Sequence, residues 1–146
     1  MFRALKCNLA LPLRLSDAEG ADMSNDKTAV LVVEDEALIR FAAKDLLESA
    51  GYEALEATNA DEAIRILEAR TDIRVVFTDV DMPGTMDGLK LAHFVRDRWP
   101  PIKIVVASGM QIVAESQLPT GSRFFRKPYE DGSIISALAE LLDTAP

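Results

Sequence analysis

The sequence predicts an α/β protein built on a doubly wound parallel sheet, and two observations support this prediction. Short apolar runs, several of them rich in β-branched residues, alternate with longer segments of helical spacing. The connections between these segments are short, and the 146 residues suit one such domain. Strands that alternate with helices form parallel sheets whose right-handed crossovers place helices on both faces.

The first half of the chain begins this alternation at residues 29–33. This run, Ala-Val-Leu-Val-Val, is entirely apolar and is typical of a strand buried on both faces. A helix is expected over 36–50, and Gly51 is placed to end it. Residues 52–57 alternate more weakly as a second strand, after which Asn59 is positioned to cap the next helix.

The second half continues the same alternation, with a weaker stretch near its middle. Lys127 lies only 127 − 108 = 19 positions after Ser108, which is short for a loop, a full helix and a strand. We therefore expect one or two helical turns there, or partial disorder. The expected elements are a strand at 74–78, a helix at 87–99 stopped by Pro100-Pro101, a strand at 102–107, a helix-like stretch at 111–117, a strand at 122–126 and a helix at 130–142.

The domain is expected to span residues 28–142, preceded by a leader at 1–27 and followed by a tail at 143–146. The leader has basic residues among Leu and Ala but no clean small-residue cleavage site. This pattern favours a disordered leader, or a start placed too early with Met23 as the natural first residue. No DNA-binding output module is expected after the domain.

Composition narrows the possible functions. The formal net charge is −8 with a pI of about 4.6, and no run of Lys and Arg stands out, which disfavours nucleic acid as a partner. No apolar run approaches the ~20 residues that a membrane span needs. A single cysteine, Cys7, fits a reducing compartment, so we expect a cytoplasmic protein without a membrane partner.

Polar residues follow four of the expected strands. Ligands of doubly wound sheets bind at the carboxyl ends of the strands, where residues distant in sequence meet. The residues at these positions are Glu34-Asp35-Glu36, Asp79-Val80-Asp81, Ser108 and Lys127-Pro128.

The carboxylates of this edge predict a magnesium site. Several carboxylates at one edge repel each other, and a hard divalent cation that prefers oxygen ligands relieves the repulsion. We expect Asp35 and Asp79 to ligate Mg²⁺ directly and Glu34 to do so through water. The backbone carbonyl of Asp81 completes the ligands that the protein supplies.

The same edge predicts transfer of a phosphoryl group. Asp79 is a carboxylate nucleophile of the kind that forms aspartyl phosphates. Lys127 supplies a positive charge for one phosphoryl oxygen, and the Ser108 hydroxyl can donate to another. Charge stabilisation of this kind supplies most of the catalysis of phosphoryl transfer.

Four segments in this order resemble the receiver domain of bacterial two-component response regulators, over roughly residues 28–142. The resemblance implies a flavodoxin-like sheet of order 2-1-3-4-5 and a protein that catalyses only its own phosphorylation and dephosphorylation. The four segments are Val32-Val33-Glu34-Asp35-Glu36, Thr78-Asp79-Val80-Asp81-Met82-Pro83-Gly84, Ala107-Ser108-Gly109 and Phe124-Phe125-Arg126-Lys127-Pro128.

The resemblance also implies roles for these residues. Asp79 would be the phosphorylation site, Lys127 would precede a cis peptide bond to Pro128, and Ser108 and Phe124 would form the switch. Phosphorylation would remodel the face formed by the segments 111–117, 122–126 and 130–142. That face would contact a downstream protein or form a homodimer, and the phosphoryl donor would be a histidine kinase or a histidine phosphotransfer protein.

Two residues depart from the family pattern. Thr85 is an extra residue in the segment Met82-Pro83-Gly84-Thr85-Met86-Asp87-Gly88. Asp81 places an acid two residues after Asp79, a position from which side chains tune dephosphorylation in that family.

Other functions remain open at this stage. A phosphorelay intermediate or a phosphate sink would use the same residues. The Asp79-Val80-Asp81 segment resembles the motif of haloacid-dehalogenase-like phosphohydrolases, although it follows the third expected strand rather than the first. A flavin carrier is disfavoured, since Glu34-Asp35-Glu36 would repel a flavin phosphate.

Overall fold

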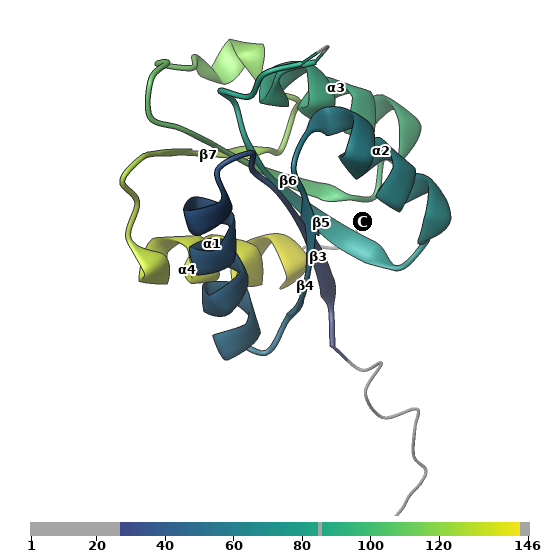
Figure 1. Ribbon diagram of the computed structural model, residues 1–146, viewed down its shortest axis with the longest axis vertical. Coiled ribbons are helices and arrows are strands. Elements are labelled where there is room, and N and C mark those ends of the chain that lie inside the picture. The colour runs from purple at the N-terminus through teal and green to yellow at the C-terminus, as the bar shows by residue number, and fades with distance from the viewer. Residues whose placement is uncertain (1–26, 85, 144–146) are drawn as a thin grey trace, which may run out of the picture.

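The structure is a computed structural model that describes residues 27–84 and 86–143. The expected leader lies outside these residues except for Lys27, and so do Thr85 and most of the expected tail. Within the described residues, five parallel strands form one sheet in the order β4-β3-β5-β6-β7. This is the predicted order 2-1-3-4-5, and the predicted fold class is confirmed (Figure 1).

The elements fall close to their expected positions. Most expected boundaries agree with the structure to within one residue. The elements are β3 (Ala29–Val33), α1 (Ala37–Ser49), β4 (Glu53–Ala57), α2 (Ala60–Ala69), β5 (Ile73–Asp79), α3 (Gly88–Arg98), β6 (Lys103–Ser108), the 3-10 helix η3 (Glu115–Gln117), β7 (Arg123–Arg126) and α4 (Asp131–Asp143).

Helices cover both faces of the sheet, with α1 and α4 on one side and α2 and α3 on the other (Figure 1). All five residues of β3 are buried, as its unbroken apolar run predicts. Because side chains alternate along a strand, Leu31 packs in the core on the α2–α3 face, whereas Val30 and Val32 pack in the core on the α1–α4 face. The sheet is therefore a rigid central layer that fixes the positions of its strand ends.

The helix ends follow local chemistry. Gly51 has a φ of 97°, the left-handed region that glycine enters without steric cost, and it stands just after the C-cap of α1. The Asn59 side chain accepts a hydrogen bond from the backbone N–H of Glu62 at 2.8 Å, as expected for the N-cap of α2. Asp87 caps α3 in the same way through the backbone N–H of Lys90 at 2.9 Å.

The helix-like stretch expected over 111–117 is reduced to the single 3-10 turn of η3. This agrees with the expectation of one or two turns. Side chains of α3 form hydrogen bonds with the end of η3 and with the segment after it. Nε2 of His93 lies 2.7 Å from the carbonyl oxygen of Gln117, and the guanidinium of Arg96 donates to the carbonyl of Thr120 at 2.8 Å. Contacts to α3 thus replace part of the hydrogen bonding that a full helix would make within itself.

Candidate functional site

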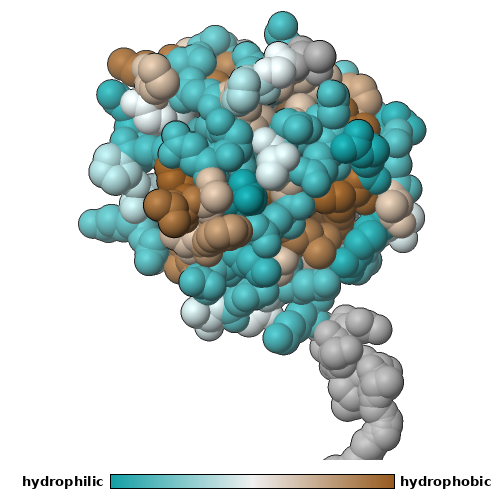
Figure 2. Space-filling view, viewed as in Figure 1, coloured by the Kyte–Doolittle hydropathy of each residue, from teal (hydrophilic) through white to brown (hydrophobic). Residues whose placement is uncertain are grey.

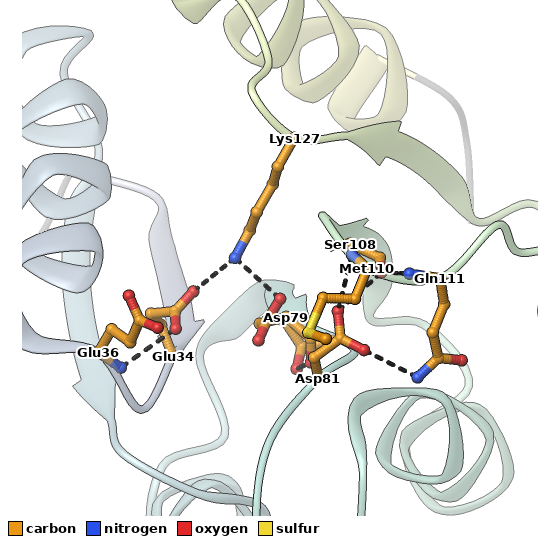
Figure 3. A network of polar contacts seen from close by, with 9 residues as sticks. Glu34, Glu36, Asp79, Asp81, Ser108, Met110, Gln111 and Lys127 are labelled. Carbon is orange, nitrogen blue, oxygen red and sulfur yellow. Dashed lines mark hydrogen bonds and ion pairs between the residues drawn. The ribbon is translucent and has the colours of Figure 1, made fainter.

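The sheet brings the predicted site residues to the carboxyl ends of its strands (Figure 3). Asp79 is the last residue of β5 and Ser108 is the last residue of β6. Glu34 directly follows β3, and Lys127 directly follows β7. Because the strands are parallel and in register, these ends meet at one edge of the sheet, as the sequence predicted.

Lys127 lies between two carboxylates. Its ammonium donates to Oδ1 of Asp79 at 2.8 Å and to Oε1 of Glu34 at 3.0 Å (Figure 3). The two acidic side chains are only 5% and 6% exposed. The backbone N–H of Lys127 also donates to the carbonyl of Ser108, and the Lys127–Pro128 peptide bond is cis, as expected.

Burial governs the electrostatics of the two acids. It raises the pKa of both Glu34 and Asp79 above their ordinary values, although the hydrogen bond from Lys127 opposes this shift. Burial alone would lower the pKa of Lys127, but the hydrogen bonds to the two carboxylates raise it, so the lysine stays charged. One cation therefore faces two buried acids, which leaves negative charge that is not neutralised.

Glu34, Asp35 and Asp79 are positioned to hold a metal ion. Each offers a carboxylate oxygen, and these three oxygens lie within 4.8 Å of one another. A set of oxygen donors with excess negative charge fits a hard cation such as Mg²⁺. The three acids predicted as metal ligands from sequence are thus close enough to act together.

The side chain of Asp81 accepts hydrogen bonds from other residues at this edge of the sheet. Its Oδ2 accepts hydrogen bonds from the Ser108 hydroxyl at 2.8 Å and from the backbone N–H of Met110 at 3.4 Å. Its Oδ1 accepts from the side-chain amide of Gln111 at 2.8 Å. Burial would raise the pKa of Asp81, but these hydrogen bonds together lower it below its usual range. Asp81 is therefore held in its ionised form.

Gln111 is a residue that the sequence reasoning missed. Its backbone N–H donates to the Ser108 hydroxyl oxygen at 3.0 Å, while its side chain binds Asp81 (Figure 3). The first contact lies within the loop that follows β6, and the second crosses from this loop to the end of β5. A glutamine in an expected helix carries no pattern that would identify such a role.

Gly88 sets how closely α3 approaches the site. A Cβ added at this residue would lie 1.9 Å from the carbonyl oxygen of Asp79. The backbone N–H of Gly88 also donates to the carbonyl of Val80 at 3.0 Å. Only glycine allows this contact, so Gly88 fixes the backbone that carries Asp79.

Phe124, the expected switch aromatic, lies in β7 opposite Val106. Its side chain is half-buried against the core on the α2–α3 face. It is two residues before Arg126, which pairs with Ser108 in the register of β6 and β7. The structure therefore places the predicted switch residues on neighbouring strands.

Comparison with protein-family models matches residues 30–139 to the response regulator receiver domain. The chain belongs to the response regulator receiver family. The chemotaxis protein CheY of Thermotoga maritima is 36% identical to this receiver over 114 residues, which cover 75% of the chain and 92% of CheY. A receiver protein structure from Sinorhizobium medicae WSM419 superimposes with a TM-score of 0.74 at 26% identity, covering 82% of this chain and 97% of that one.

Other relatives are longer proteins. The receiver is 33% identical to the sensor kinase CckA of Brucella abortus over 86% of its own chain but only 13% of CckA. It is 33% identical to the response regulator FleR of Pseudomonas aeruginosa over 75% of its own chain and 24% of FleR. The crystal structure of the CckA receiver domain matches with a TM-score of 0.66 at 32% identity, over 78% of this chain and 98% of that one. The receiver thus spans a quarter or less of these two proteins.

Proposed function

We propose that this receiver accepts a phosphoryl group on Asp79 from a histidine kinase or a histidine phosphotransfer protein. The observation that supports this most is the position of Lys127, whose ammonium contacts Asp79 and Glu34 together. A nucleophile beside a fixed positive charge, at an edge where other carboxylates gather, is what aspartyl phosphorylation requires. A kinase donor uses ATP, so the proposal places the protein in the cytoplasm.

The residues of the site have separate roles in this proposal. Asp79 attacks phosphorus through a carboxylate oxygen, and the bond from phosphorus to the donor breaks as the new one forms. The Lys127 ammonium binds a phosphoryl oxygen, and the Ser108 hydroxyl donates to another once it leaves Asp81. Glu34, Asp35, Asp79 and the carbonyl of Asp81 would hold Mg²⁺, which when bound neutralises charge on the phosphoryl oxygens.

We further propose that the phosphorylated receiver signals by protein contact through the face formed by η3, β7 and α4, either with a downstream protein or as a homodimer. Ser108 and Phe124 connect the site to this face through β6 and β7. CheY, of which the chain covers 92%, is an example of a relative that consists almost entirely of a receiver domain. No helix within residues 27–84 and 86–143 is long and apolar enough to cross a membrane.

Intact-mass measurement with acetyl phosphate tests the phosphorylation. The wild-type protein is expected to gain one phosphoryl group in Mg²⁺ and none in EDTA. Asp79→Asn should gain none, whereas Asp97→Asn, an exposed acid on α3, should behave as the wild type. An adduct that survives in Asp79→Asn would refute the assignment of Asp79.

The output proposal has its own test. Backbone NMR shifts are recorded before and after phosphorylation, and the largest changes outside the site are expected in η3, β7 and the start of α4. Changes confined to α1 and β4 would contradict the proposed face. Specific binding of a promoter by the phosphorylated protein would overturn signalling by protein contact alone.

A further inference from the structure

The turn between β3 and α1 carries two of the three clustered acids. Glu34 is the first residue after β3, Asp35 follows it, and α1 begins at Ala37. The backbone N–H of Glu34 donates to the carbonyl of Ala57 on β4 at 3.0 Å, and the backbone N–H of Glu36 donates to Oε2 of Glu34 at 3.1 Å (Figure 3). The positions of both acids therefore depend on how firmly this turn is held.

Arg40, in the first turn of α1, makes a further contact with this turn. Its guanidinium donates through Nη1 to the carbonyl oxygen of Glu34 at 2.9 Å. Nε of the same guanidinium donates to Oε1 of Glu56 at 3.0 Å. Glu56 lies on β4 opposite Val32, so the guanidinium connects the turn to the neighbouring strand. The Arg40 side chain is only 12% exposed, which is low for an arginine.

The location of Arg40 is not explained by general electrostatics. The N-terminus of a helix carries partial positive charge and disfavours a cation. An arginine near the acidic cluster would also repel a bound Mg²⁺. The ion pair with Glu56 is not a sufficient reason, because Lys44, one turn further along α1, contacts the other oxygen of Glu56 at 3.2 Å. Among the described residues, the contact that Arg40 makes and Lys44 does not is the hydrogen bond to Glu34.

A guanidinium is suited to holding two groups at once. It is planar and presents several donors in a fixed geometry, whereas the ammonium of a lysine is a single point charge on a flexible chain. With Nε bound to the Glu56 carboxylate, Nη1 is directed at the Glu34 carbonyl and fixes it relative to β4. Residues that orient metal ligands without touching the metal commonly raise the metal affinity of a site.

We propose that Arg40 is a positioning residue of the acidic site, which holds the turn of Glu34 and Asp35 against β4 so that both carboxylates stay within reach of Asp79. The inference rests on the proposed function, because these acids are the ones that would hold Mg²⁺. It assigns Arg40 no contact with the metal or the phosphoryl group. Loss of Arg40 should loosen the turn and weaken Mg²⁺ binding, although removing a positive charge would by itself strengthen the binding of a cation.

Hydrogen exchange of the whole chain in EDTA tests the positioning without any metal. In Arg40→Gln the backbone amides of Glu34 and Glu36 are expected to exchange about threefold to tenfold faster, the range that one ordinary hydrogen bond gives. Lys44→Gln is the matched control, because it also removes one cation of α1 and one contact with Glu56 but leaves the bond to the Glu34 carbonyl in place. It should leave both rates unchanged. Amides of β6 report global unfolding, and in Arg40→Gln their exchange should rise less than that of the turn.

Titration with Mg²⁺, followed by NMR, tests the consequence for the site. Arg40→Gln is expected to bind Mg²⁺ about tenfold more weakly than the wild type, the lower end of the usual effect of residues that orient metal ligands. Lys44→Gln should bind Mg²⁺ as tightly as the wild type or slightly more tightly. Glu56→Gln keeps an acceptor for Nε of Arg40, so it should lose less affinity than Glu56→Ala, which removes the acceptor.

The outcomes separate this inference from the proposed function. Unchanged exchange of the turn in Arg40→Gln, an equal rise in the amides of β6, or equal effects of Arg40→Gln and Lys44→Gln would overturn the role of Arg40. So would Mg²⁺ binding to Arg40→Gln that is as tight as in the wild type or tighter, because charge removal alone gives that result. Absence of Mg²⁺ binding in the wild type would instead refute the proposed metal site, and the exchange in EDTA would still decide whether Arg40 holds the turn.

Discussion

The Ser108 hydroxyl donates a hydrogen bond to the carboxylate of Asp81 at 2.8 Å, so the proposed switch hydroxyl is held away from the phosphorylation site. The same carboxylate binds Gln111, whose backbone N–H in turn binds the Ser108 oxygen. Movement of Ser108 toward a phosphoryl group on Asp79 would break this set of contacts. Asp81 is therefore placed to oppose phosphorylation through Ser108.

Asp81→Ala is accordingly expected to favour the phosphorylated protein. A hydrogen bond to a charged group contributes about 1.5–3 kcal/mol, and the unphosphorylated state alone would lose it. Removing the Asp81 charge also reduces repulsion of the incoming phosphoryl group. The ratio of phosphorylated to unphosphorylated protein at limiting acetyl phosphate, measured by intact mass, should rise about tenfold or more, because about 1.4 kcal/mol corresponds to a factor of ten.

A double-mutant cycle separates the two causes. If the hydrogen bond to Ser108 matters, Asp81→Ala should have a smaller effect in a Ser108→Ala background than in the wild type. An equal effect in both backgrounds would assign the change to charge alone. Gln111→Ala, which leaves the Asp81–Ser108 bond in place, should give a smaller increase than Asp81→Ala.

Magnesium is expected to stabilise the folded protein through the three clustered acids. Binding to the native state alone raises the free energy of unfolding with metal concentration. Thermal unfolding should therefore shift upward on adding Mg²⁺, and Glu34→Gln or Asp79→Asn should reduce the shift. Glu36→Gln is the matched control, because Glu36 is adjacent in sequence but outside the cluster. An undiminished shift in Asp79→Asn would place the metal elsewhere.

The same site predicts a pH dependence. The folded-state pKa values of Glu34 and Asp79 are raised, so without metal these acids oppose folding once both are ionised. Their contribution to stability therefore decreases as pH rises through the raised values. Magnesium requires the ionised forms, so its affinity should fall as pH is lowered from neutral through the raised pKa values, which lie above the ordinary carboxyl range of about 4. Calorimetric titration across this range checks both the direction and the midpoint.

The fold was predictable because the sequence patterns that indicate its strands and helices are local and recur along the chain. The run Ala29–Val33, the cap Asn59 and the terminator Gly51 each determine an element through neighbouring residues alone, and the structure confirms all three. The reduction of 111–117 to η3 was predictable from the length available, but its cause was not. It depends on contacts from His93 and Arg96, which lie on α3 and become neighbours only in the folded chain.

The parts of the site that follow from the order of strands and helices were also predictable. Parallel strands deliver their carboxyl ends to one edge, so the meeting of Asp79 with Lys127 followed from the alternation of elements. The contact of Asp81 with Gln111 and the approach of Gly88 to Asp79 did not, because both depend on side-chain and backbone packing between elements. The roles assigned to the site residues in phosphorylation stay predictions.

Gly88→Ala is expected to disturb the site by displacing the backbone of Asp79. The new methyl group would overlap the carbonyl oxygen of Asp79, which is backbone and cannot move aside as a flexible side chain would. Overpacking of this kind costs about 1–3 kcal/mol, and relaxation would displace Asp79 from Lys127. Chemical denaturation should show the loss of stability, and acetyl phosphate should label the variant more slowly.

Gly132→Ala provides the matched control for Gly88→Ala. Gly132 lies in the first turn of α4, and a Cβ there would meet no atom within 4 Å among the described residues. Alanine at such a site is expected to be neutral or to stabilise by about 0.4–1 kcal/mol, since it restricts the unfolded chain. Equal destabilisation in both variants would argue against a special role for the contact of Gly88 with Asp79.

Arg96→Ala should release the segment that follows η3. The guanidinium of Arg96 donates to the carbonyls of Pro100 and Thr120, so it ties the end of α3 to the chain leading into β7. Losing these bonds should cost about 1–3 kcal/mol and raise hydrogen exchange over residues 117–123, because carbonyls freed here lose a charged donor. Arg65→Ala, which changes an exposed arginine on α2, should leave exchange in this segment unchanged.

Since β7 carries Phe124 on the proposed output face, Arg96→Ala should also change the NMR response of that face to phosphorylation, while labelling of Asp79 itself proceeds. Loss of labelling together with the response would mean that Arg96 supports the whole fold rather than this segment.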